Sequence, residues 1–144
     1  MRVSSTFNDG ETIPSKFSCQ GQNVNPKLEL SEMPKGAKSL ALIMDDPDAP
    51  MGTFVHWVVW NIPVSKEIKE NAKNLGVDGV GTAGSPGYHG PCPPPGHGPH
   101  RYFFKVYAID ILLELKPGSD KDGLLKAMEG HVLASAELMG RFER

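Results

Sequence analysis

The sequence predicts a mainly β fold with one or two short helices near the C-terminal end. Residues 54–62 and 102–110 are rich in aromatic and β-branched side chains, which favour strands. Residues 39–44 form a continuous apolar segment of strand length, as expected for a strand buried on both faces. The 144 residues include 16 glycines and 13 prolines, which favour many turns and few long helices. We therefore expect a single β-rich domain over residues 1–144, arranged as a sandwich or a Greek key.

The shorter segments between these strands are mostly turns and loops. Residues 27–30 alternate polar and apolar side chains, as in a strand with one exposed face. The apolar segment 39–44 is expected to end where the acidic, proline-containing loop 45–50 begins, because proline cannot continue a central strand. Residues 65–74 favour a helical turn or a surface loop. Residues 76–87 are predicted to form a glycine-rich loop.

Two segments near the C-terminal end have helical character. Residues 120–128 resemble a helix that Ser119 or Asp120 would cap at its N-terminus. The apolar face of this helix would consist of Leu124, Leu125 and Met128. Residues 132–139 are helix-prone by composition, because alanine and leucine are good helix formers.

Charge and hydropathy argue against several classes of partner. The chain has 15 basic and 17 acidic residues, so no overall positive charge would attract nucleic acid or an anionic membrane surface. The longest apolar segment, residues 55–62, is far shorter than the ~20 residues of a membrane-spanning helix. Residues 1–15 contain no apolar run of the kind found in secretory signals. We therefore expect a cytoplasmic protein with no nucleic-acid partner and no integral membrane segment.

A stiff loop concentrates the chemistry of the second half of the chain. Eleven of the sixteen residues 84–99 are glycine or proline, and proline restricts the backbone before any ligand binds. The loop region holds three of the five histidines and one of the two cysteines: His89, His97, His100 and Cys92. Gly96 and Gly98 would allow a ligand to approach the backbone closely. A plain surface connection is the alternative interpretation, and a disulfide between Cys19 and Cys92 stays open.

One interpretation of this loop is a metal site or a hydrolytic centre. His89, Cys92, His97 and His100 superficially resemble a run of zinc ligands, although the intervening prolines restrict how they converge. Cys92 beside His97 or His100 would be a candidate nucleophile. A metal-dependent or cysteine hydrolase using this loop is therefore the alternative function. The chain contains no G-x-S-x-G, G-x-x-x-x-G-K-[ST] or H-E-x-x-H motif, so we expect no enzymatic activity.

The interpretation that we favour is a pocket for a small anion. Asp46 or Asp48, His56, His100 and Tyr102 flank predicted core strands, and ligand sites occur preferentially at such loop-bearing sheet ends. A protonated histidine and a tyrosine hydroxyl would donate to phosphate oxygens, and a carboxylate would accept from an ammonium group. This combination suits a phosphate monoester or phosphoethanolamine. A structural role for His56 in the core, and turn roles for Asp46 and Asp48, are the alternatives.

Three segments together resemble one known family. These are residues 46–50 (DPDAP), residues 56–63 (HWVVWNIP) and residues 90–102 (GPCPPPGHGPHRY). They are similar to the two signature regions of the phosphatidylethanolamine-binding protein family, in the bacterial and archaeal form described as Raf kinase inhibitor-like. The resemblance covers nearly the whole chain. It implies a large central antiparallel Greek-key sheet, a smaller sheet, one or two short helices and a small anion cavity at one end.

The resemblance also implies roles for individual residues. It suggests ligand contacts for Asp46, His56 and Tyr102, and a pocket shaped by Asp48, Pro94 and His100, with Gly98 in the same block. It further implies that residues 134–139 are partly strand. We therefore expect a cofactor-free, metal-free protein that binds a small phosphorylated or zwitterionic ligand, such as a phospholipid headgroup or a phosphorylated protein. Further expectations are a homodimer, which would cover exposed sheet edges and Trp60, and, as a third alternative, peptidase inhibition.

Overall fold

The computed structural model describes all 144 residues and contains eight strands, one short 3₁₀ helix and one α-helix. The first half of the chain forms β1 (Arg2–Ser4), η1 (Ser15–Phe17), β2 (Leu28–Ser31), β3 (Ser39–Asp46), β4 (Phe54–Ile62) and β5 (Glu67–Ile68). The second half forms β6 (Val77–Asp78), β7 (His100–Ile109), α1 (Lys121–Met128) and β8 (Val132–Phe142).

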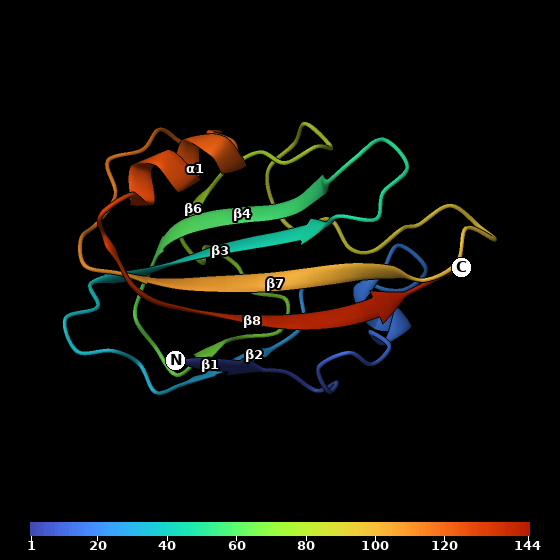
Figure 1. Cartoon of the computed structure of the whole chain (residues 1–144), viewed down its shortest axis with the longest axis horizontal. Coiled ribbons are helices and arrows are strands. Elements are labelled where there is room, and N and C mark those ends of the chain that lie inside the picture. Colours follow the sequence, from blue (N-terminus) through green and yellow to red (C-terminus); the bar gives the residue numbers. More distant parts are fainter.

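Two antiparallel sheets account for all the strands. The larger sheet has the order β6-β4-β3-β7-β8, and its four long strands run side by side in Figure 1. The smaller sheet has the order β1-β2-β5. The mainly β prediction and the expectation of a large and a small antiparallel sheet are therefore confirmed.

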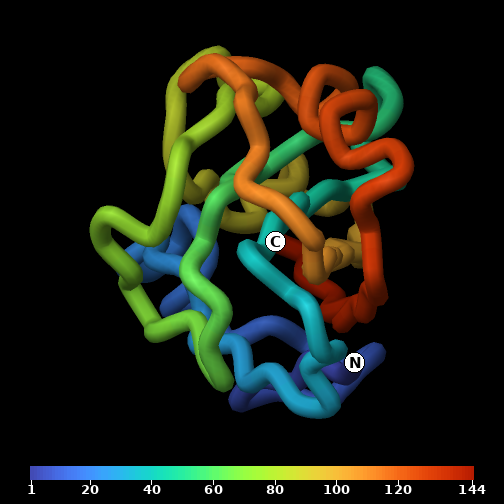
Figure 2. Tube along the Cα trace, turned by 90° about the vertical axis from the view of Figure 1, so that its left-hand side faces the viewer, coloured from blue at the N-terminus to red at the C-terminus, as the bar shows by residue number.

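The larger sheet is covered on both faces, and the alternation of side chains along β3 shows this directly. Leu40, Leu42 and Met44 belong to a core cluster shared with the smaller sheet and the N-terminal segment. Ala41 and Ile43 belong to a second cluster that includes the buried helix residues Leu124 and Met128. In Figure 2 the blue N-terminal residues and the orange-red helix accordingly lie on opposite sides of the central strands. A strand buried on both faces explains why residues 39–44 are continuously apolar.

Asn61 interrupts the alternation in β4 with a β-bulge. Leu40 pairs with Ile62 and Leu42 pairs with Val59, so one residue of β3 faces two residues of β4. Asn61 has a φ of +53°, a left-handed conformation that asparagine tolerates better than most residues. Its side chain donates to the carbonyl oxygen of Leu113 (3.0 Å) and accepts from the Leu113 amide (2.8 Å). The bulge therefore joins the sheet to the segment that leads to α1.

Several boundaries differ from the sequence prediction. Strand β3 continues through Asp45 and Asp46 instead of ending before them, because both residues still pair with β4 and Asp45 also pairs with β7. Short strand β5 lies in residues 65–74, which were predicted as a helical turn or a surface loop, and short strand β6 lies in residues 76–87, which were predicted as a glycine-rich loop. Both strands are only two residues long, so their sequences carry almost no periodic signal.

The C-terminal region confirms one helix and excludes the other. Of the two candidate caps, Asp120 is the one that caps α1, by accepting from the Gly123 amide (2.9 Å). Leu125, however, is exposed and does not share the buried face of the helix. Residues 132–139 belong to the long strand β8, because pairing with β7 overrides their helical propensity. The family resemblance implied this in part, for residues 134–139. No helix of the structure combines the length and apolar character needed to cross a bilayer.

Trp60 does not provide the exposed apolar surface that the expected homodimer would cover. Its side chain is fully buried in the cluster beneath α1. The chain therefore covers this residue by itself.

Candidate functional site

The candidate site lies at one end of the larger sheet, where side chains from β3 and β7 share a face. Asp46 follows Met44 by two residues, and both point to the face that carries the main core cluster. On β7, His100 and Tyr102 continue the same alternation from Phe104. Because Asp45 pairs with Phe103, the next residue Asp46 lies beside Tyr102. The loops that precede β4 and β7 meet at this end of the molecule, on the right in Figure 1.

Asp45 points to the opposite face of the same strand. Its carboxylate accepts from Lys105 on β7 (3.2 Å) and from Lys121 on α1 (2.8 Å). Of the two adjacent acids at the end of β3, only Asp46 is therefore available to the candidate site.

A second β-bulge brings His56 to the pocket face. Met44 pairs with Trp57 and Asp45 pairs with Val55, which leaves His56 as the extra residue of β4. Bulges redirect side chains in this way and are frequent beside functional sites. The ring of His56 packs against Phe54, with centroids 4.6 Å apart, and against Tyr102 in a T-shaped arrangement with centroids 5.2 Å apart.

These residues line a pocket of about 390 Å³. Its polar lining consists of Asn23, Asp46, His56, His89, His100 and Tyr102. Its apolar lining consists of Ala49, Pro50, Phe54, Ala83, Pro93 and Pro94. Five of the seven residues proposed from the sequence thus reach one cavity, with a size and a mixture of polar and apolar groups typical of small-ligand sites.

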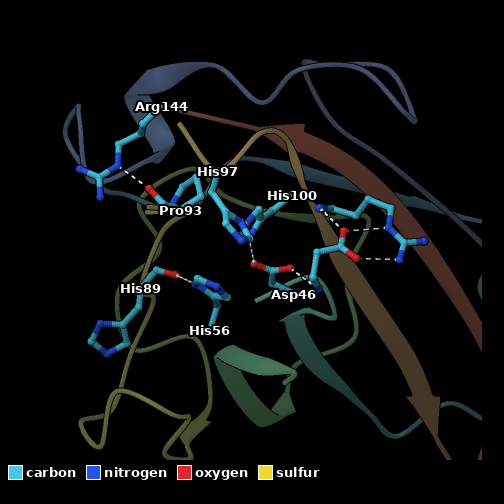
Figure 3. A network of polar contacts seen from close by, with 9 residues as sticks. Asp46, His56, His89, Pro93, His97, His100 and Arg144 are labelled. Atoms are coloured by element: carbon cyan, nitrogen blue, oxygen red, sulfur yellow. Dashed lines mark hydrogen bonds and ion pairs between the residues drawn. The ribbon is translucent and has the colours of Figure 1, made fainter. Parts of the chain in front are cut away.

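A chain of hydrogen bonds connects Asp46 to two histidines (Figure 3). The Nδ1 atom of His100 lies 2.7 Å from one carboxylate oxygen of Asp46 and donates to it. The Nε2 atom of His100 lies 2.6 Å from Nδ1 of His97. The backbone amide of Asp48 donates to the second carboxylate oxygen (2.7 Å). Both Asp46 and His100 are almost fully buried, so each needs the partner that the other supplies.

The tautomer of neutral His56 follows from its partner. Its Nδ1 lies 2.7 Å from the carbonyl oxygen of His89, and a carbonyl accepts hydrogen bonds but cannot donate them (Figure 3). The proton therefore resides on Nδ1, and Nε2 carries a lone pair with no partner in the protein. Burial lowers the pKa of His56, while the bond to His89 and the charge of Asp46 oppose this shift. Neutral His56 consequently offers an acceptor, and protonated His56 offers a donor.

Tyr102 supplies a hydroxyl that stays protonated at neutral pH. Burial raises the pKa of its phenol, and the negative charge of Asp46 raises it further. The hydroxyl is therefore available as a donor to an anion and as an acceptor to a protonated group.

Two residues proposed from the sequence do not line the pocket. Asp48 forms a two-pronged pair with Arg101, with distances of 2.9 Å to both Nε and Nη2, and it accepts from the Arg101 amide at 3.0 Å. This bond lowers the pKa of Asp48 to about 2. The pair joins the loop after β3 to the start of β7 and acts as a brace outside the cavity. Gly98 lies outside the lining too and adopts a φ of +87° in the turn before β7.

The N-terminal segment contributes a wall that the sequence did not indicate. Cys19 and Asn23 line the pocket, and Cys19 forms a disulfide with Cys92. The amide of Gly90 donates to the Asn23 side chain (2.8 Å), which fastens the proline-rich loop to this wall. In the sequence, the two cysteines were the one signal for a contact between the N-terminal segment and the proline-rich loop. Their presence alone left open whether they are paired.

The disulfide argues against Cys92 as the nucleophile or metal ligand of a hydrolase that would use this loop. Cys92 has no free thiolate to act as nucleophile or metal ligand while it is bonded to Cys19. His89 turns toward Ser85, whose hydroxyl lies 3.1 Å from the His89 Nε2 atom. No three of the His, Cys, Asp and Glu side chains are grouped as metal ligands.

Comparison with known proteins agrees with the geometry. The family model described as phosphatidylethanolamine-binding protein matches residues 3–143. The chain belongs to the phosphatidylethanolamine-binding protein family. This result confirms the family expected from the three sequence segments, and the chain thus has the fold of a family named for ligand binding.

Relatives of the family match over nearly the full chain. A UPF0098 protein of Pyrococcus horikoshii is 49% identical over 152 residues, which cover 100% of this chain and 77% of the relative. A UPF0098 protein of Methanothermobacter thermautotrophicus is 49% identical over 145 residues, covering 96% and 95% of the two chains.

Two solved structures of the family have the same fold. A phosphatidylethanolamine-binding protein homologue of Chlamydia trachomatis, CT736, is 44% identical with a TM-score of 0.94, covering 99% of this chain and 97% of the other. YbcL of E. coli, described as a new member of the mammalian family, is 30% identical with a TM-score of 0.89, covering 99% and 98%.

Proposed function

We propose that this protein is a non-enzymatic binding protein whose pocket holds a phosphate monoester or a phosphoethanolamine-type zwitterion. The observation that carries the proposal is the convergence of Asp46, His56, His100 and Tyr102 on one cavity of about 390 Å³. The four side chains come from three different strands, and each is held by packing or by hydrogen bonds before any ligand is present. Such preorganisation reduces the entropy lost on binding.

The hydrogen-bonding capacity of the pocket suits a singly protonated phosphate group. The Tyr102 hydroxyl donates to a phosphate oxygen. The lone pair on Nε2 of neutral His56 accepts from a phosphate hydroxyl, and the same atom donates when His56 is protonated. A phosphate monoester has a second pKa near 6, so a protonated oxygen is accessible close to neutral pH. The carboxylate of Asp46 attracts a cationic group such as ammonium, which favours a zwitterion over a bare dianion.

Apolar residues at the pocket favour a ligand whose phosphate is attached to a group containing carbon. Ala49, Pro50 and Phe54 belong to the segment between β3 and the first residue of β4, and Ala83 comes from the loop after β6. These residues accommodate the carbon chain of a headgroup or the side chain that carries a phosphate on a protein partner. The phosphate group is common to both sources.

Isothermal titration calorimetry with inorganic phosphate, phosphoethanolamine and ethanolamine tests the proposal. We expect one site per chain, with phosphoethanolamine binding more tightly than inorganic phosphate, and ethanolamine alone binding weakly. The variant His56→Ala should lose most of the phosphate affinity while its circular dichroism spectrum stays unchanged.

The matched control is His131→Ala. This histidine pairs with Asp110 at 2.9 Å, outside the pocket, so its removal should leave phosphate binding unaltered. Absence of heat with both phosphate compounds at millimolar concentration, or equal losses in the two histidine variants, would contradict the proposal.

A further inference from the structure

The Cys19–Cys92 disulfide forms part of the pocket wall and is open to solvent. It links the segment after η1 to the proline-rich loop across 73 residues of sequence. Both cysteines line the pocket, and both are exposed. An exposed disulfide is accessible to attack by a thiolate, in contrast to one buried in a core. The bond therefore combines two properties: contact with the ligand cavity and access to a reductant.

Cys92 also contributes the only backbone donor in its part of the loop. Residues 91, 93, 94 and 95 are prolines and have no N–H group. The amide of Cys92 forms no hydrogen bond within the protein. A free amide donor beside a cavity is a suitable ligand for an anion, because its dipole favours negative charge. The position of this donor depends on how firmly Cys92 is held.

Hydrogen bonds also hold the chain on either side of Cys92. On the N-terminal side, the Cys19 amide donates to the Pro91 carbonyl (3.1 Å) and the Tyr88 hydroxyl donates to the Phe17 carbonyl (2.8 Å). On the C-terminal side, the Arg144 Nε atom donates to the Pro93 carbonyl (2.7 Å; Figure 3). We therefore expect the loop to stay attached when the disulfide is reduced, but none of these hydrogen bonds involves the Cys92 side chain or its amide.

We propose that Cys19 is a positioning residue for the pocket: its disulfide with Cys92 fixes the Cys92 amide toward the bound anion, so that ligand affinity depends on the thiol redox state. This inference builds on the anion-binding function proposed above. The switch is a thiol–disulfide exchange with a dithiol. One dithiol molecule supplies two electrons and two protons, is itself oxidised to a disulfide, and leaves Cys19 and Cys92 as two free thiols.

Linkage makes the effect reciprocal. If the oxidised form binds the anion more tightly, the anion stabilises the disulfide against reduction by the same factor. For a two-electron couple, a tenfold difference in affinity corresponds to a shift of about 30 mV in the reduction potential. A disulfide that only adds stability to the fold would show no such dependence on ligand.

Calorimetric titration of inorganic phosphate into oxidised and dithiothreitol-reduced protein tests the inference. We expect the reduced protein to bind phosphate about tenfold more weakly, which corresponds to loss of one fixed donor to a charged ligand. Equal affinity of the two forms would overturn the redox inference and leave the anion-binding function intact. Absence of binding by the oxidised form would overturn both.

The double variant Cys19→Ser/Cys92→Ser separates the disulfide from other effects of the reductant. It should bind phosphate with the affinity of the reduced protein and show no response to dithiothreitol. A response in this variant would assign the effect to the reductant and overturn the inference.

A second measurement needs no variant, so it remains decisive if the double variant fails to fold. The disulfide is equilibrated in dithiol–disulfide buffers with and without saturating phosphate. Phosphate should lower the reduction potential by about 30 mV, and an unchanged potential would contradict the inference.

Discussion

Asp46 and His100 are joined by a hydrogen bond of 2.7 Å although 54 residues separate them in sequence. Each side chain is only 3% exposed. The bond joins the end of β3 to the start of β7, the two strands whose adjoining loops form most of the pocket. The bond therefore links two strands of the sheet and holds two polar side chains in the lining of the candidate site.

Removal of one partner of this pair should destabilise the protein strongly. His100→Ala leaves the Asp46 carboxylate buried with only the Asp48 amide as partner, which should lower the free energy of unfolding by about 3 kcal/mol. The measurement is urea denaturation followed by tryptophan fluorescence. In a double-mutant cycle, Asp46→Asn combined with His100→Ala should cost less than the sum of the single changes. Additivity within ~0.5 kcal/mol would show that the two residues are not coupled.

The affinity for a dianion should increase as the pH falls. Burial places the pKa of His56 below its ordinary value, so above that pKa the ring must take up a proton before Nε2 can donate. Sulfate is the suitable probe, because its charge does not change between about pH 5 and pH 8. Its dissociation constant should rise by up to about tenfold per pH unit above the pKa of His56.

His56→Gln is the control for this pH dependence. Glutamine cannot titrate, so the variant should show a flatter profile. The negative charges of Asp45 and Asp46 raise the pKa of His56. They would therefore shorten the pH interval above this pKa in which the affinity for sulfate depends on pH. An identical slope in wild type and variant would exclude His56 as the titrating group.

Tyr102→Phe should separate ligand binding from folding. The ring packs against His56 and the core and is retained, so the free energy of unfolding should change by no more than about 1 kcal/mol. Loss of the hydroxyl should weaken phosphate binding by about tenfold, the effect typical of one hydrogen bond to a charged group. Thermal unfolding and calorimetric titration of the same sample make the comparison. Unchanged phosphate affinity would remove Tyr102 from the proposed ligand contacts.

The stability that the bulge at Asn61 contributes should depend on both the left-handed backbone conformation and the side-chain amide of this residue. Asn61→Ala loses both hydrogen bonds to Leu113 and places alanine at a φ of +53°, which should cost about 2–4 kcal/mol in the free energy of unfolding. Asn61→Gly loses the same bonds but tolerates the backbone conformation, so it should be less destabilising. Urea denaturation of the two variants gives the comparison. Equal destabilisation would mean that backbone strain contributes nothing.

Individual elements show how far the sequence predicts the fold. The bounds of β4 were predicted correctly at 54–62, because aromatic and β-branched residues fill the whole strand and Pro63 follows it. The helix α1 was also predicted, with Ser119 or Asp120 as its cap, since the capping signal is local. Strand β8 was assigned correctly only through the family resemblance. Its composition favours helix, and pairing with β7 is a non-local interaction that propensity does not include.

The candidate site was likewise predicted from the sequence only in part. Asp46, His56, His100 and Tyr102 were identified because polar residues at the ends of apolar strands stand out in the sequence. The orientation of His56 was not predictable, since it depends on a bulge that appears only when β3 and β4 are paired. Asp48 and Gly98 were expected at the pocket, but they lie in the brace and the turn beside it.

The sequence by itself determined that the long strands β3, β4 and β7 and the helix α1 are present, and which family the chain resembles, because those properties depend on residues close together along the chain. Only the tertiary structure decided that Cys19 and Asn23 form a wall of the pocket, that Cys92 is bonded to Cys19, and that Asp46 instead of Asp45 faces the cavity. These outcomes depend on strand register and on contacts between distant segments. A change of register by one residue reverses the face to which every side chain points, and composition carries no record of that choice.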